Sequence, residues 1–250
     1  MNTSTEVHND HCLNCDTLLK GNYCYQCGQK AQSTNVPMRE FVKDAAETLF
    51  NIDNRVFTTI KDLFLKPGYV TKKYIEGQRA RYLPPLRLYI TASILYFLVI
   101  SLVDSNQFLL AKINFGGEED AFGDFLRYSM IVLVPAFAWV VQLVHRKQKR
   151  FYVQFLIFSV HLHVIWFFFF GVISICDHTL NTISLSSAGS FLVTAVSSLA
   201  KLSFFIYLVL FVKNVFDEGW GKSLLKSFLI MMGYSLFMAA VVFLYLFFWL

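Results

Sequence analysis

Long apolar runs divide this chain into a polar first third and a lipid-soluble remainder. A helix needs roughly 20 largely apolar residues to cross about 30 Å of hydrocarbon. Inside a bilayer the backbone can pair only within the chain, so helices are expected despite many β-branched and aromatic residues. The pattern predicts an all-α integral membrane protein with about five transmembrane helices, at approximately 87–103, 127–144, 152–176, 191–212 and 225–249.

Composition supports this division of the chain. The sequence is 56% hydrophobic and 17% aromatic and contains 27 Phe, whereas soluble domains are usually about 45–50% apolar. Residues 1–86 hold 11 of the 22 Lys and Arg and 9 of the 17 Asp and Glu. We therefore expect three parts: a cysteine-containing module (1–33), a basic juxtamembrane region (34–86) and a transmembrane domain (87–250).

Charge in the connecting loops predicts the orientation. Basic residues crowd the loops after the second and fourth apolar stretches: Arg146, Lys147, Lys149 and Arg150 in one, Lys213, Lys222 and Lys226 in the other. The loop after the first stretch carries Glu118, Glu119, Asp120 and Asp124 against Lys112 alone, and residues 178–190 contain no Lys or Arg. The positive-inside rule then places the N-terminus in the cytoplasm and the C-terminus outside.

Four of the five cysteines form two closely spaced pairs, Cys12-x2-Cys15 and Cys24-x2-Cys27. Four thiolates at this spacing can complete the tetrahedral shell of Zn²⁺, and Gly28 permits the tight turn after the second pair. Iron could use the same ligands. Disulfides are disfavoured because the predicted topology places these residues in a reducing compartment. The spacing predicts a zinc ribbon.

Such a ribbon has about 20 residues and cannot fold on a hydrophobic core of that size, so metal binding must supply its folding energy. Four cysteine ligands leave no open coordination position, which is typical of a structural site. Two roles remain open for the ribbon. It could simply stabilise the N-terminus, or it could present a surface to a cytoplasmic protein partner through Lys20, Tyr23, Tyr25 and Lys30.

The juxtamembrane region reads as a series of amphipathic helices. The first is expected from Pro37 to about Phe50, and a second follows a cap at Asp53 or Asn54 and ends at Pro67-Gly68. A third is expected from Tyr69 to Glu76. Basic residues near a span attract anionic lipid, so we expect headgroup contacts, although topology signalling explains the same charges. These residues are Lys66, Lys72, Lys73, Arg79, Arg81 and Arg87.

Ionisable residues within apolar stretches are costly and are functional candidates. Lys201 is expected near mid-membrane, facing the bundle interior and pairing with a polar group, with His161 as one candidate. His161 and His163 are also expected near the middle of their span, and Gln154 shares the face of His161. These side chains could line a proton, ion or solute path. Alternatively, they hydrogen-bond between helices, and Lys201 snorkels to the surface.

Several segments resemble a known family. The knuckles CLNC and YCYQCGQK, residues 49–90 and the segment FSVHLHVIWFF resemble bacterial membrane proteins classed as a domain of unknown function. The resemblance is densest over residues 12–97, and residues 105–124 show no family motif. It implies zinc at the four paired cysteines and location in the bacterial inner membrane. The resemblance implies no particular activity for this chain.

The sequence contains no GxSxG, HExxH, Walker A or Gly-rich nucleotide motif. It therefore favours a non-enzymatic membrane scaffold or regulator whose ribbon engages a partner. The alternative is a transporter or channel subunit that uses the polar faces of the third and fourth spans. A lipid-modifying enzyme is a third reading, which only the intramembrane histidines suggest. Membrane lipids are expected partners, nucleic acid is not, and an oligomer is compatible with the sequence.

Overall fold

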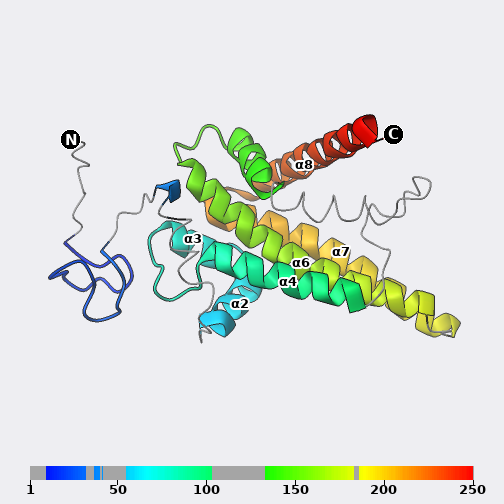
Figure 1. Ribbon diagram of the computed structural model, residues 1–250, viewed down its shortest axis with the longest axis horizontal. Coiled ribbons are helices and arrows are strands. Elements are labelled where there is room, and N and C mark those ends of the chain that lie inside the picture. Colours follow the sequence, from blue (N-terminus) through cyan, green and yellow to red (C-terminus); the bar gives the residue numbers. More distant parts are fainter. Residues whose placement is uncertain are drawn as a thin grey trace.

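The computed structural model describes residues 10–31, 37–39, 41, 55–102, 133–182 and 186–249. Residues 10–31 form a small module with two cysteine knuckles, here called the knuckle module, at one end of a helical bundle (Figure 1). Most of the helix expected after Pro37, the outer loop at 105–124 and the start of the expected span at 127–144 lie outside the described residues.

Two short helices follow the boundaries that the sequence predicts. Helix α2 spans Arg55–Leu65, and α3 spans Tyr69–Ile75. Pro67 and Gly68 separate them, and Gly68 adopts a left-handed backbone with φ of 79°. Gly77, at φ of 97°, follows α3. Proline cannot continue the hydrogen bonding of α2, and glycine makes the positive φ inexpensive, so the chain turns between the two helices.

Four described helices are long and apolar enough to cross a membrane: α4 (Pro85–Leu102), α6 (Tyr152–Thr182), α7 (Ser187–Phe216) and α8 (Trp220–Trp249). A shorter apolar helix, Leu133–Val144, corresponds to the described part of the expected second span. The chain is thus a helical protein with four candidate membrane spans in its described residues. The fifth span stays a prediction.

Helix α6 is the centre of the bundle. It packs against α4 on one side and α7 on the other, and it is the most buried of the four candidate spans (Figure 1). Helix α8 is the least buried and packs mainly along α7. Bulky aromatic residues fill the α4–α6 contact, where the rings of Tyr96 and Phe167 lie 5.0 Å apart. Such ring pairs contribute beyond simple area burial.

Helices α2 and α3, here called the cap, pack on the bundle: α3 contacts both α6 and α7, and α2 contacts α6. Leu63, Val70 and Thr71 are fully buried in this contact. On the other side, Phe57 of α2 is 84% exposed and Leu65 is 69% exposed. The amphipathic pattern of the juxtamembrane region therefore buries one face against protein and leaves apolar side chains on the other.

Helix α7 holds the end of α2 and the turn after it. The Tyr207 hydroxyl donates a hydrogen bond to the carbonyl of Leu63, and Asn214 Nδ2 donates to the carbonyl of Pro67 at 2.7 Å. The Leu63 carbonyl lies in the last turn of α2 and the Pro67 carbonyl follows that turn, where intrahelical partners are missing. At Gly68, an added Cβ would lie 2.9 Å from the Phe211 carbonyl oxygen. Only glycine permits so close an approach of the turn to α7.

We predict that Gly68→Ala destabilises the protein by roughly 2–4 kcal/mol, since it combines a left-handed alanine with a backbone clash. Thermal unfolding of the detergent-solubilised protein measures the effect. Gly221→Ala is the matched control, because a Cβ at Gly221 meets nothing within 4 Å and its φ is not positive. That control should be neutral or slightly stabilising. Equal melting temperatures for Gly68→Ala and wild type would contradict the close contact of the α2–α3 turn with α7.

Candidate metal centre

The knuckle module repeats one backbone motif twice, twelve residues apart. In the first knuckle the Cys12 N–H donates to the Thr17 carbonyl and the Asp16 N–H donates to the Cys12 carbonyl, both at 2.8 Å. The second knuckle makes the same two bonds from Cys24 to Gln29 and from Gly28 to Cys24. Asp16 and Gly28 occupy equivalent left-handed positions, with φ of 59° and 72°. Each knuckle thus curls its backbone around its own pair of sulfurs.

The four sulfurs converge on one point. Cys12 Sγ lies 3.6 Å from Cys27 Sγ, and Cys15 Sγ lies 3.5 Å from Cys24 Sγ. All four lie within 4.8 Å of one another. Tetrahedral coordination with metal–sulfur bonds of about 2.3 Å separates the sulfurs by roughly 3.8 Å. The four cysteines therefore fit one metal ion, and the described residues contain no other such cluster of His, Cys, Asp and Glu.

The thiols differ in their surroundings. Thr17 Oγ1 lies 3.3 Å from Cys15 Sγ, and hydrogen bonds from the side chain and backbone of Thr17 lower the pKa of the Cys15 thiol to about 6. Desolvation raises the pKa of Cys27 to about 12. Thiolates are the metal-binding form, so Cys15 is the ligand most readily deprotonated, whereas Cys27 needs the charge of a metal ion to ionise near neutral pH.

Gln29 joins the module to the segment between α3 and α4. Its side chain Nε2 donates to the Gly77 carbonyl at 2.8 Å, and its Oε1 accepts from the backbone N–H groups of Arg79 and Ala80 at 3.0 and 2.9 Å. Leu13 of the first knuckle packs on the same place, because a Cβ at Gly77 would lie 2.6 Å from Leu13 Cδ1. The module is therefore docked on the protein through three hydrogen bonds and a close apolar contact.

His161 lies just beyond this docking site. Its Nδ1 is 2.9 Å from Thr71 Oγ1 of α3, and its ring meets Tyr74 edge-on at 6.3 Å. The Arg79 guanidinium covers the ring of Tyr74 at 5.6 Å. His161 is the tenth residue of the 31-residue α6 and lies beside α3, and its expected place near the middle of the membrane span stays a prediction. The sequence did not show that α3 packs against this part of α6.

His163 faces the opposite side of α6. Its Nδ1 lies 2.8 Å from the Ser159 carbonyl, and its ring contacts Phe137 at 5.2 Å and Tyr234 at 6.0 Å. His161 and His163 are both buried, but they enter separate contacts, as their spacing on a helix predicts. Gln154 is half-buried nearer the start of α6. Both histidines thus contact side chains of neighbouring helices.

Lys201 lies at the middle of α7, and its side chain is exposed. The expectation that it faces the bundle interior is wrong for the described chain, and His161 pairs with Thr71 instead. Apart from Ser197, the buried residues of α7 begin at Tyr207, whose hydroxyl binds the Leu63 carbonyl of α2, and α3 packs on α7. Lys201 precedes this buried part of α7.

Most of the predicted lipid-contacting cations have partners within the protein. Lys66 pairs with Asp62 at 3.1 Å, Lys72 with Asp217 at 2.5 Å and Lys73 with Glu76 at 3.0 Å. Arg81 lies 3.8 Å from the same Asp62. Arg87 is only 5% exposed at the start of α4, which contradicts its expected role at headgroups. Packing of α4 against the rest of the protein covers it.

One family model matches the chain. It is described as a protein of unknown function, DUF3667, and it matches residues 53–97. The matched segment contains α2, α3, the docking segment at 77–80 and most of α4. No curated protein and no solved structure matches the chain. The chain is therefore similar to this family over the segment that caps the bundle.

Sequence reasoning singled out the four cysteines but missed Leu13 and Gln29, which dock the module. A twelve-residue repeat was the available signal, because it aligns Leu13 with Tyr25 and Thr17 with Gln29. Different side chains at equivalent positions of the two knuckles mark these positions as unlike. Thr71 gave no comparable signal, since a threonine in a short amphipathic helix usually faces water.

Replacing Gln29 by alanine should loosen the docking of the module without loss of metal. Three hydrogen bonds contribute roughly 2–3 kcal/mol together, so the amides of Arg79 and Ala80 should exchange hydrogen at least about 30-fold faster. Hydrogen–deuterium exchange read by mass spectrometry tests this. Gln26→Ala is the matched control, because Gln26 is exposed in the same knuckle. Unchanged exchange in Gln29→Ala would show that the contact contributes nothing.

Proposed function

We propose that this chain is a non-enzymatic membrane scaffold or regulator whose knuckle module binds zinc and engages a cytoplasmic protein partner. One observation carries the proposal: the module is docked on the helical bundle through Leu13 and Gln29 while its tyrosines stay exposed. A docked, rigid module presents a surface in a defined orientation, which favours recognition because less freedom is lost on binding.

Zinc is the metal that this donor set favours. Four thiolates that lie close enough for tetrahedral coordination suit Zn²⁺, although iron accepts the same ligands. With all four positions filled by cysteine, the ion would hold the fold of the module and would leave no site for water or substrate. Cys12 and Cys24 are buried, which also suits a structural ion. This donor set supports a structural role over a catalytic one.

The internal repeat identifies the surface left for a partner. Leu13 and Tyr25 are equivalent positions of the two knuckles, but Leu13 packs on Gly77 whereas Tyr25 is 66% exposed. Tyr23 is also 64% exposed, and Lys20 Nζ lies 5.6 Å from the Tyr25 ring centroid. Exposed tyrosines beside a lysine are typical of protein interfaces, where aromatic residues provide most of the binding energy.

The proposal includes a location and an orientation. Positive loop charge supports a cytoplasmic module and an outer C-terminus, and the resemblance to bacterial membrane proteins supports the bacterial inner membrane. Exposed Phe57 and Leu65 on α2, with lysines nearby, support contact of the cap with lipid. The alternative of a solute or ion path has less support, because His161 and His163 enter separate packed contacts.

We expect one zinc ion per chain in the purified protein and loss of that ion in Cys12→Ser or Cys27→Ser, because each removes a ligand from a closed shell. Elemental analysis measures the metal. Cys176→Ser is the control, since Cys176 lies in α6 outside the cluster. An iron chromophore, or metal retained in full by Cys12→Ser, would contradict the zinc assignment.

Partner recognition is tested with a photo-crosslinking residue in place of Tyr25 in cells that express the full chain. A specific surface should give one discrete adduct, absent when the probe replaces Leu18, which is 51% exposed on the first knuckle. The partner protein identified in the adduct is then purified. It should bind the double variant Tyr23→Ala, Tyr25→Ala of the full chain at least about 10-fold more weakly than it binds wild type. Equal affinity of the partner for wild type and the double variant would refute the role of this surface in binding.

A further inference from the structure

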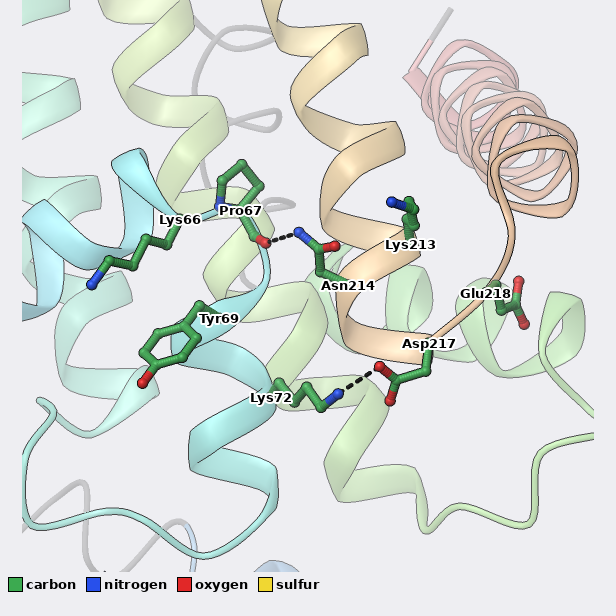
Figure 2. Close-up of a pocket in the computed structure, with 8 residues that line it drawn as sticks. All are labelled: Lys66, Pro67, Tyr69, Lys72, Lys213, Asn214, Asp217 and Glu218. Atoms are coloured by element: carbon green, nitrogen blue, oxygen red, sulfur yellow. Dashed lines mark hydrogen bonds and ion pairs between the residues drawn. The ribbon is translucent and has the colours of Figure 1, made fainter.

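A cavity of about 550 Å³ lies between the α2–α3 turn and the end of α7, on the side of the bundle that carries the cap (Figure 2). Figure 2 shows Lys66, Tyr69 and Lys72 on one side of it and Lys213 and Asn214 of α7 on the other. Asp217 and Glu218 line its edge at the α7–α8 turn. A volume of this size is typical of small-molecule sites.

The walls of this cavity are held in place by contacts between the elements. Asn214 Nδ2 donates to the Pro67 carbonyl, and Lys72 Nζ pairs with Asp217 across the cavity (Figure 2). Gly68 lets the α2–α3 turn pack directly against the backbone of α7. The cavity is therefore formed before a ligand arrives, which lowers the cost of binding.

Charge defines what the cavity can accept. Three lysines against Asp217 and Glu218 leave the lining with a formal charge of +1. Lys72 already pairs with Asp217, and Lys226 pairs with Glu218. Among the described residues Lys213 has no carboxylate partner, and its Nζ lies 4.2 Å from the centroid of the Trp220 ring. A group with a single negative charge, such as a phosphodiester, balances this lining.

The membrane side of the cavity is apolar. Leu199, Leu202 and Ile206 lie on the same face of α7 as Lys213, and each is more than half exposed. A 30-residue helix is about 45 Å long and exceeds the roughly 30 Å of hydrocarbon, so its last turn reaches the headgroup level. Exposed Trp220 beside Lys213 suits that level, where aromatic residues concentrate. An acyl chain could thus run along α7 directly from the cavity.

We propose that this cavity binds the phosphodiester headgroup of a membrane glycerophospholipid, with the acyl chains lying along Leu199, Leu202 and Ile206 of α7. Lys66 and Lys213 hold the phosphate, and the carboxylates at the edge accept hydrogen bonds from a hydroxyl or amine of the headgroup. This site does not depend on partner recognition by the knuckle module. Cys12→Ser should therefore leave lipid binding unchanged, so the two proposals fail independently.

Native mass spectrometry of the delipidated full-length protein, titrated with dioleoyl phosphatidylglycerol, tests the site. Wild type should retain one lipid, and Lys213→Gln should weaken binding about five-fold, as expected for one cation near the headgroup. Lys66→Gln combined with Lys213→Gln should weaken it about 25-fold. Lys222→Gln is the matched control, because Lys222 is an exposed lysine of α8 outside the cavity lining. It should change binding less than two-fold.

Glycerol 3-phosphate, which has the phosphate but no acyl chains, forms the second arm. It should compete with the lipid only at concentrations at least about 100-fold higher. Equal competition would overturn the lipid assignment in favour of a soluble phosphate, and equal losses in Lys213→Gln and Lys222→Gln would overturn the site. If Lys213→Gln does not fold, two other variants test the site. Lys66→Gln should weaken lipid binding, and the charge-preserving Lys213→Arg should not.

Discussion

The rest of the described structure depends on the contact between the α2–α3 turn and α7. Helix α2 ends with backbone carbonyls that lack intrahelical partners, and Tyr207 and Asn214 of α7 donate to them. Gly68 brings the two backbones into direct contact. Because this turn is held, α3 lies against α6 and places Thr71 beside His161. A single close approach thus positions the cap, the buried histidine and the cavity at the end of α7.

The knuckle module depends on the same cap in a second step. Gln29 binds backbone groups at Gly77, Arg79 and Ala80, which directly follow α3. Arg55 Nη1 of α2 also donates to the Ala80 carbonyl at 3.2 Å, so the docking segment is held from both sides. The module is small and needs a metal ion to fold, but its orientation comes from the protein on which it docks. Metal binding and docking are therefore separate contributions to one arrangement.

Electrostatics in the cap are mostly local and balanced. Asp62 accepts a hydrogen bond from the hydroxyl of Tyr82 at 3.1 Å and pairs with Lys66. Burial, with Asp62 nearby, raises the pKa of Tyr82 to about 12, so this phenol stays a donor at any physiological pH. Basic residues that look free in the sequence are in fact shared between carboxylates and aromatic rings. Lys213 of α7, outside the cap, has no carboxylate partner among the described residues, and its Nζ lies over the Trp220 ring.

The sequence by itself determined the elements of this protein. Apolar runs of the required length predict the long helices, Pro67-Gly68 predicts the end of α2, and the paired cysteines predict the metal cluster, since each signal is local. Tertiary structure alone decided which sides of those elements meet. Helical spacing separates His161 from His163, but only the position of α3 directs His161 to Thr71. The same spacing put Lys201 at mid-helix without showing that most buried residues of α7 lie beyond it. Gln29 reaches Gly77 across 48 residues, and contacts over such separations leave no local pattern to read.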